Sequence, residues 1–264
     1  MNGHKPLHGY TILITRAAGQ SREVIDRIHE LGGTTECFPM IEITEPDSWD
    51  MCDRAIITMK KYDSVIFTSA NAVRGFLFRI ENNFPQAKDI LNRRTVYAVG
   101  SKTKEALTDH GIKTDAVPET YTADAVVALI TESGAAGKTF LLPAGNLTRD
   151  VIEETLKRAD AVVDRIPVYT TKKPAATDTA RLEQLVRQQL IDVVTFFSPS
   201  SVHHFFELID PALVQNIPVA VIGTTTSDAV TGYGIQAGIQ PDKATGDALV
   251  ESIVKYKQRS EQPG

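Results

Sequence analysis

The sequence predicts an α/β protein built from two similar units, each with a parallel sheet and flanking helices. Short apolar runs alternate with amphipathic helical patterns along nearly the whole 264-residue chain, which is typical of parallel sheets. The chain also repeats itself. The pattern of Asp63–Val73 returns 129 positions later as Asp192–Val202, and that of Val96–Thr103 returns 123 positions later as Val219–Thr226. We therefore expect two units that divide the chain about equally.

The first elements set the pattern for the rest. Tyr10–Thr15 is apolar and β-branched, which predicts a buried strand. Ser21–Leu31 has apolar residues at 24, 25, 28 and 31, which form one helical face, and Gly32 and Gly33 end it. The same criteria predict strands near 64–68, 95–99, 139–142, 192–197 and 218–222. They predict helices near 70–80, 101–110, 123–132, 148–158, 178–189, 199–208, 225–233 and 246–256.

Two stretches interrupt this alternation. Residues 36–46 and 164–174 each contain an internal proline and a closing proline, so neither is expected to be helical. They occupy equivalent places in the two units. We expect both to be extended crossings between two lobes, which would allow the lobes to hinge.

Composition narrows the class of protein. Apolar residues make up 42% and charged residues 23%, as in ordinary globular proteins, and the net charge of −5 argues against general nucleic-acid binding. No apolar run reaches the length of a membrane span, and the N-terminus lacks the apolar core of a signal peptide. We therefore expect a cytoplasmic protein in which Cys37 and Cys52 are free thiols.

Several common catalytic motifs fail their structural tests. Ala136–Thr139 resembles the end of a phosphate-binding loop, but Glu132 stands where that motif needs glycine, and a strand follows instead of a helix. No dinucleotide-binding glycine motif follows a strand, and no nucleophile elbow is present. His203 and His204 are helix neighbours that point about 100° apart. We expect no metal site.

Hydroxyl residues at the ends of strands are the strongest functional signal. Ser69, Thr103, Ser198 and Thr226 each follow a strand, where the next helix begins, at duplicated positions. Each could cap its helix, which stabilises a helix by ~1 kcal/mol. Alternatively, the carboxyl ends of parallel strands and helix N-termini are where α/β sheets bind anions. A hydroxyl can do both.

Three further side chains are candidates. Tyr169 lies in the second crossing, either packed as a linker residue or facing a ligand. Arg16 ends the first strand, and Arg149 lies in the first turn of its helix, where the helix dipole disfavours a cation. Each arginine could be solvated or could clamp a carboxylate.

An ordered set of short motifs resembles the uroporphyrinogen-III synthase family. The motifs spread over nearly the whole chain: Thr68–Val73, Val99–Thr103, Pro143–Arg149, Val168–Thr170, Phe196–Ser200 and Ile222–Thr226. The resemblance implies two flavodoxin-like lobes with parallel sheets, joined by two extended crossings. It implies that they interleave, one from residues 1–43 and 171–264 and the other from 44–170.

The resemblance also implies an activity. Family members cyclise hydroxymethylbilane to uroporphyrinogen III, with loss of water and inversion of ring D, in the cleft between the lobes. Tyr169 matches the family's proton-donating tyrosine. The implied substrate-binding residues are Ser69, Asn71, Thr103, Ser198, Ser200, Thr226, Arg16 and Arg149. No cofactor is implied. The resemblance suggests a monomer and allows a transient contact with hydroxymethylbilane synthase.

A second hypothesis is a non-catalytic, two-lobed protein that binds a tetrapyrrole or another anion. Two hinged lobes with a polar cleft would suit such a binder as well. The retention of Tyr169 and all four hydroxyl positions favours the enzyme.

Overall fold

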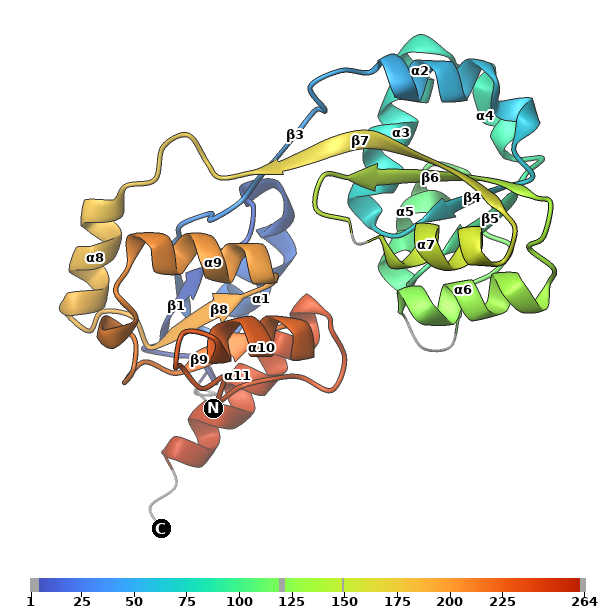
Figure 1. The fold of residues 1–264 in the computed structure, drawn as a ribbon. Coiled ribbons are helices and arrows are strands. Elements are labelled where there is room, and N and C mark those ends of the chain that lie inside the picture. Colours follow the sequence, from blue (N-terminus) through green and yellow to red (C-terminus); the bar gives the residue numbers. More distant parts are fainter. Residues whose placement is uncertain (1–4, 119–121, 149, 262–264) are drawn as a thin grey trace. The chain divides into compact units, whose positions relative to one another are not determined.

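The computed structural model describes residues 5–118, 122–148 and 150–261. The chain forms two compact units, and it passes from one to the other twice. Unit 1 contains the chain up to Glu42 and again from Lys172 onward, whereas unit 2 contains Ile43–Thr171. Each unit is an α/β structure with a parallel sheet, as the alternation of strands and helices predicts (Figure 1).

The sheet of unit 1 has the strand order β2-β1-β8-β9. Its strands are β1 (Thr11–Ile14), β2 (Thr34–Cys37), β8 (Val193–Phe196) and β9 (Val219–Val221), and all neighbours pair in parallel. A parallel bridge between Ala220 and Ile239 extends the edge beyond β9. Counted along unit 1, this order is 2-1-3-4-5, which is the flavodoxin-like order.

Helices cover both faces of this sheet. They are α1 (Arg22–Glu30), α8 (Thr179–Arg187), α9 (Pro199–Leu208), α10 (Thr224–Thr231) and α11 (Gly246–Ser260). Successive strand side chains point to opposite faces. Leu13 therefore packs in a core with residues of α8, α9 and α10, while Ile12 and Ile14 pack with residues of α1 and α11. The result is a layer of helices on either side of the sheet.

The sheet of unit 2 has the order β3-β7-β6-β4-β5. Its strands are β3 (Glu42–Thr44), β4 (Ser64–Phe67), β5 (Thr95–Ala98), β6 (Thr139–Gly145) and β7 (Val162–Lys172). A parallel bridge from Tyr97 to Ala116 extends it past β5. If β6 and β7 are matched to β1 and β2, then β4 and β5 match β8 and β9. Apart from its additional edge strand β3, unit 2 therefore has the strand order of unit 1, with its two halves joined in the opposite sequence order.

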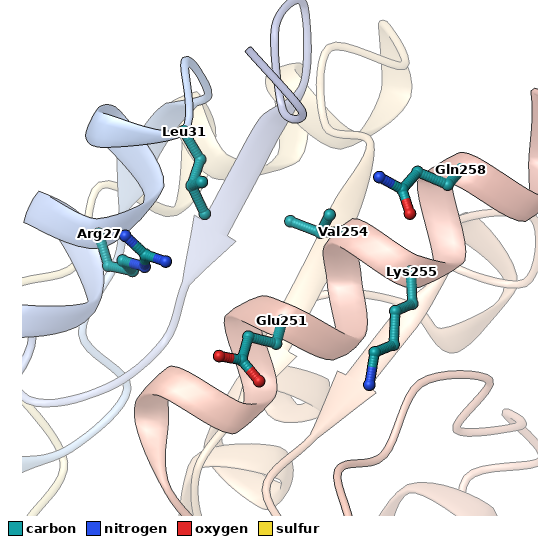
Figure 2. A pocket seen from close by; sticks show the side chains of 6 residues that line it. All are labelled: Arg27, Leu31, Glu251, Val254, Lys255 and Gln258. Atoms are coloured by element: carbon teal, nitrogen blue, oxygen red, sulfur yellow. The ribbon is translucent and has the colours of Figure 1, made fainter.

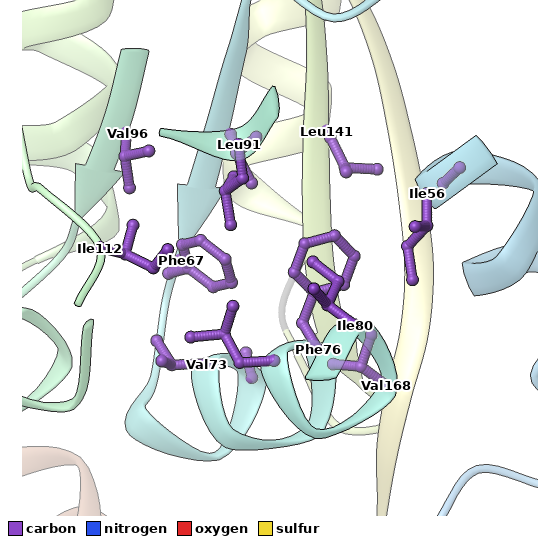
Figure 3. Close-up of a cluster of buried hydrophobic side chains, with 14 of the residues drawn as sticks. Ile56, Phe67, Val73, Phe76, Ile80, Leu91, Val96, Ile112, Leu141 and Val168 are labelled. Carbon is purple, nitrogen blue, oxygen red and sulfur yellow. The ribbon is translucent and has the colours of Figure 1, made fainter. Parts of the chain in front are cut away.

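Unit 2 also has two cores, one on each face of its sheet. The helices are α2 (Asp50–Ile57), α3 (Ala70–Asn83), α4 (Ala87–Leu91), α5 (Ser101–Asp109), α6 (Ala123–Glu132) and α7 (Val151–Arg158). Figure 3 shows the larger core, where Phe67 of β4 and Phe76 of α3 are fully buried with ring centroids 5.8 Å apart. Side chains of α6 and α7 form the core on the other face with Ile66 and Phe140.

The sequence-based elements differ from the structure in several places. Helices α2 and α4 were not expected, and neither was β2. In α2 the exposed residues Met51 and Ile57 are apolar like the buried Cys52 and Ile56, so the amphipathic pattern is blurred. The second predicted crossing is an 11-residue strand, β7, most of which belongs to the sheet of unit 2. Its burial alternates, with Ile166 and Val168 inward. The internal proline, Pro167, lies next to the register shift between Ala144 and Gly145 in the β6–β7 pairing, and sheets tolerate proline at such irregularities.

Candidate functional site

Ser69 caps the helix that follows β4 in unit 2. Its backbone is extended, with φ −155° and ψ 155°, and its Oγ accepts a hydrogen bond of 3.1 Å from the Ala72 N–H. Such a cap satisfies one of the amides that a helix start leaves without an intrahelical partner. The remaining amides of this turn lie at the carboxyl end of the sheet, and Asn71, half-buried, lies in the same turn. Ser69 is therefore an N-cap, and its hydroxyl lies at the carboxyl end of the sheet.

Tyr169 of β7 lies beside this cap. Its hydroxyl oxygen is 3.5 Å from Ser69 Oγ, at the long limit of a hydrogen bond, and its half-buried ring packs against the larger core of unit 2. The two residues are 100 positions apart in the chain, and the sheet brings them together because β6 separates β7 from β4 by only one strand. Ser69 and Tyr169 thus form a hydroxyl pair at the start of α3.

Ser198 repeats this arrangement in unit 1. Its backbone has φ −162° and ψ 154°, and its Oγ accepts a hydrogen bond of 3.2 Å from the Ser201 N–H at the start of α9. Ser200 Oγ lies 3.1 Å from Ser198 Oγ, so the turn presents two neighbouring hydroxyls. The duplicated sequence pattern therefore folds into a duplicated helix cap.

Thr103 and Thr226 take a different position from the two serines. Each is the third residue of its helix, α5 or α10, and each is at least 95% buried. The helix caps are Gly100 and Gly223, whose carbonyls accept hydrogen bonds of 3.1 Å from the Thr103 and Thr226 amides. The expectation that these threonines might cap their helices is wrong, because glycine occupies the capping position. They instead form the packed side of the same turns.

Arg16 lies at the carboxyl edge of unit 1, two residues after β1. Its guanidinium carbon is 5.1 Å from the centroid of the Phe197 ring, directly before Ser198, and its Nε is 3.4 Å from Gln20 Oε1. A guanidinium stacked in this way is held in place next to the hydroxyl turn. Arg149, the other candidate arginine, lies outside the described residues.

Buried threonines hold the strand ends of unit 1 together. Thr15 Oγ1 donates to the Thr195 carbonyl at 2.6 Å, and Thr195 Oγ1 donates to the Leu13 carbonyl at 2.7 Å. Both residues are almost fully buried. This reciprocal pair fixes β1 against β8, and so fixes Arg16 relative to Ser198. The sequence did not predict this pair of hydrogen bonds, because threonine is common in strands for its β propensity alone.

The charge pattern of the helix starts is a second missed signal. Helices α3, α5, α9 and α10, which follow the strands carrying the hydroxyl turns, have no acidic residue in the first turn. Acidic residues do occupy the first turn of α1, α2, α4, α6, α7 and α11, and α8, which also lacks one there, is capped by Asp178. Acidic side chains are normally favourable there. Their absence leaves the positive ends of these four helices free to attract an external anion.

A hollow of about 250 Å³ lies elsewhere in unit 1, between α1 and α11 (Figure 2). Its lining residues are Arg27, Leu31, Glu251, Val254, Lys255 and Gln258. Arg27 and Leu31 come from the end of α1 and its C-cap, the other four come from α11, and Arg27 pairs with Glu30 at 3.1 Å. We assign this hollow no role. Among the described residues, no cluster of metal-ligating side chains occurs, and no helix is long and apolar enough to span a membrane.

Together these features make two sheet edges whose chemistry suits anions, one in each unit; we call them the anion-binding edges. Each combines a serine cap, a glycine-capped helix with a buried threonine, and unneutralised helix dipoles. Backbone amides and hydroxyls at such positions bind carboxylates or phosphates. The edge of unit 2 also carries the hydroxyl of Tyr169, a group that can act as a proton donor.

Comparison with known proteins shows the family of the chain. The family model described as "Uroporphyrinogen-III synthase HemD" matches residues 22–251. The chain belongs to the uroporphyrinogen-III synthase family. The Chlorobaculum parvum uroporphyrinogen-III synthase is 30% identical over 246 residues, which cover 93% of this chain and 98% of that protein. The Synechococcus elongatus uroporphyrinogen-III synthase is 28% identical and covers 97% and 98% of the two chains.

Solved structures of the uroporphyrinogen-III synthase family share the fold. A mutant uroporphyrinogen III synthase from Thermus thermophilus superposes with a TM-score of 0.67 at 16% identity, over 96% of this chain and 100% of that one. The Helicobacter pylori uroporphyrinogen-III synthetase gives a TM-score of 0.62 at 18% identity, over 94% and 99%. The predicted α/β fold class and the family resemblance are thus confirmed.

Proposed function

We propose that this protein is a uroporphyrinogen-III synthase, a cyclising lyase that converts hydroxymethylbilane to uroporphyrinogen III. The family match over residues 22–251 carries this proposal, because it spans both units and both duplicated turns. The geometry supports it. A tyrosine hydroxyl beside a capped helix start suits a reaction in which a hydroxyl group leaves from a polycarboxylate substrate.

The anion-binding edges would hold the substrate's carboxylates. In unit 2 these groups would meet the starts of α3 and α5, with Ser69, Asn71 and Thr103. In unit 1 they would meet the starts of α9 and α10, with Ser198, Ser200 and Thr226. Arg16 would add a cation beside Ser198, and we assign Arg149 a similar role from its place in the sequence. Hydrogen bonds to a charged carboxylate are stronger than those between neutral groups, so several such contacts can fix one conformer of a flexible chain.

Tyr169 would assist the first chemical step. Its hydroxyl donates a proton to the departing hydroxyl group, which leaves as water while the pyrrole electron pair generates an azafulvene cation. Ring D, at the opposite end of the bilane, attacks the methylene carbon of this cation through its own substituted α-carbon and forms a spiro-pyrrolenine. Fragmentation and recombination then close the macrocycle with ring D inverted. The proton released when the last pyrrole regains aromaticity balances the one that Tyr169 gave.

Control of conformation would supply most of the catalysis. The free bilane closes by itself to the isomer in which ring D is not inverted, so the enzyme must favour attack at the substituted carbon. Holding reacting atoms near attack distance is worth several kcal/mol in well-oriented systems. This fits a site built from hydroxyls, amides and one tyrosine.

Analysis of the product isomers tests the proposal. Hydroxymethylbilane is generated in place by a deaminase, this protein is added, and the oxidised products are separated into uroporphyrins I and III. Isomer III should dominate. If a folded protein yields only isomer I, the enzyme proposal fails, and the alternative of a non-catalytic tetrapyrrole- or anion-binding protein takes its place.

We further propose that the protein acts as a monomer in the cytoplasm and receives its substrate through transient contact with hydroxymethylbilane synthase. Free thiols at Cys37 and Cys52 suit a reducing compartment. Light scattering, with and without the deaminase, tests both the oligomeric state and the contact.

A further inference from the structure

Gly145, the last residue of β6, lies directly against the ring of Tyr169. The two residues pair across β6 and β7 after a register shift between Ala144 and Gly145. A Cβ atom built on Gly145 would lie 2.3 Å from Tyr169 Cζ, 2.4 Å from Cε2 and 2.7 Å from the hydroxyl oxygen. The tyrosine ring therefore occupies the space that a side chain at position 145 would fill. A bulge of this kind re-aims a side chain, and bulges are common next to active sites.

The backbone of Gly145 does not itself require glycine. Gly145 is not among the glycines with positive φ, so its conformation is open to any L-residue. The three nearest neighbours of the added Cβ all belong to Tyr169. The lack of a side chain at 145 therefore makes room for the ring of Tyr169. Gly75 is different, because a Cβ there would lie 2.2 Å from the carbonyl oxygen of Val168, which is backbone.

Asn146 limits how the strand could yield. Its Nδ2 donates to the Thr171 carbonyl at 3.1 Å, and its Oδ1 accepts from the Thr171 amide at 2.9 Å. This two-point contact holds β7 two residues beyond Tyr169. On the other side of the glycine, the Gly145 amide donates to Thr148 Oγ1 at 3.1 Å. Because these contacts hold both the loop and the strand, the clash between a methyl group at 145 and Tyr169 would be relieved by movement of the tyrosine ring.

We propose that Gly145 is a positioning residue for Tyr169: the absence of a side chain at 145 places the tyrosine hydroxyl beside Ser69, where it can reach the leaving group. The mechanistic part rests on the proposed synthase function. The placement of the ring does not, because it follows from packing alone. A displaced ring would carry the hydroxyl away from Ser69 Oγ, which is already at 3.5 Å.

Gly145→Ala tests the kinetic consequence, with Gly238→Ala as the matched control. Gly238 is exposed, has no atom within 4 Å of an added Cβ and does not have positive φ. We expect Gly145→Ala to lower kcat by roughly tenfold, with KM changed less than about twofold, because only a transition-state contact is lost. In a Tyr169→Phe background the same change should lower kcat by less than about twofold, since no hydroxyl remains to be misplaced. Equal effects in both backgrounds would overturn the proposal.

A measurement independent of activity tests the placement. Protein labelled with ¹³C at tyrosine Cζ has a Tyr169 signal that is assigned by its loss in Tyr169→Phe. We expect that signal to shift in Gly145→Ala and to stay in place in Gly238→Ala. An unmoved signal, or a Gly145→Ala protein that does not fold, would overturn the positioning role. If wild-type protein makes only isomer I, the synthase proposal fails, while the NMR signal still decides the placement.

Discussion

The hydroxyl oxygens of Tyr169 and Ser69 lie 3.5 Å apart at the start of α3. Ser69 already accepts the Ala72 amide, so its hydroxyl is oriented by the helix it caps. The tyrosine thus lies beside an ordered hydroxyl and a helix start, a place where negative charge is stabilised. This pairing brings the proposed proton donor next to one of the duplicated serine caps.

Tyr169→Phe should slow turnover without abolishing it. Loss of a general acid commonly costs ~10²-fold or more, but the pyrrole's own electronic push should limit the loss here to roughly tenfold to a hundredfold. Steady-state formation of isomer III measures it, and the melting temperature should stay within a few degrees. Tyr256→Phe, on α11 of the other unit, is the control with the same atom removed. Full activity of Tyr169→Phe would contradict the proton-donor role.

Aspartate at the serine caps should separate capping from substrate binding. Asp caps a helix as well as Ser does, so Ser69→Asp and Ser198→Asp should change the unfolding free energy by less than ~0.5 kcal/mol. The added charge would repel a substrate carboxylate, and KM should rise about fivefold or more. Ser260→Asp, near the C-terminal end of α11, adds the same charge far from the strand ends and should leave KM unchanged. An unaltered KM in both cap variants would argue that these serines only cap helices.

Gly75→Ala should destabilise the fold. The added methyl group would meet the Val168 carbonyl oxygen at 2.2 Å, so α3 would have to move away from β7. Overpacking of this kind costs ~1–3 kcal/mol, which exceeds the ~1 kcal/mol that alanine gains over glycine in a helix. Urea unfolding measures the difference, with Gly238→Ala as the reference. Unchanged stability would mean that helix and strand separate easily.

Asp164 should make the stability of unit 2 sensitive to acid. Its carboxylate accepts hydrogen bonds from Lys61 at 2.7 Å and Tyr62 at 2.8 Å, and chiefly the Lys61 contact lowers its pKa below the ordinary 3.8. The charged form is therefore favoured by folding. This contribution is present above pH 3.8 and is lost as the pH falls through the lowered pKa. Asp164→Asn should cost ~1 kcal/mol or less near neutral pH, because the pair is partly exposed to solvent.

Urea unfolding at a series of pH values measures this effect. The stability difference between wild type and Asp164→Asn should shrink as the pH falls below about 4. A difference that is constant down to pH 2 would contradict the charge-based account, and Asp242→Asn, in an exposed loop, is the control. At high pH a separate loss is expected. Burial raises the pKa of Tyr62 to about 12, so its contribution falls as the pH rises from about 10 to 12.

The sequence by itself determined the features that depend only on residues close together along the chain. Strand runs such as Val193–Phe196 and the caps at Ser69 and Ser198 follow from local patterns, because an N-cap needs only a hydroxyl three residues before the amide it accepts. The duplication of these turns also indicated two similar edges. Helix α2 escaped prediction because apolar Met51 and Ile57 lie on its exposed face and blur the amphipathic pattern.

Only the tertiary structure decided which distant residues meet. The contact of Tyr169 with Ser69 and Gly145 depends on the order β7-β6-β4 and on a register shift, neither of which leaves a local pattern. The roles of Thr103 and Thr226 changed for a similar reason, because a glycine caps each helix and starts it three residues earlier than a threonine cap would. Strand order and register are set by packing across the whole sheet, so side-chain neighbours at its edge are properties of the folded chain.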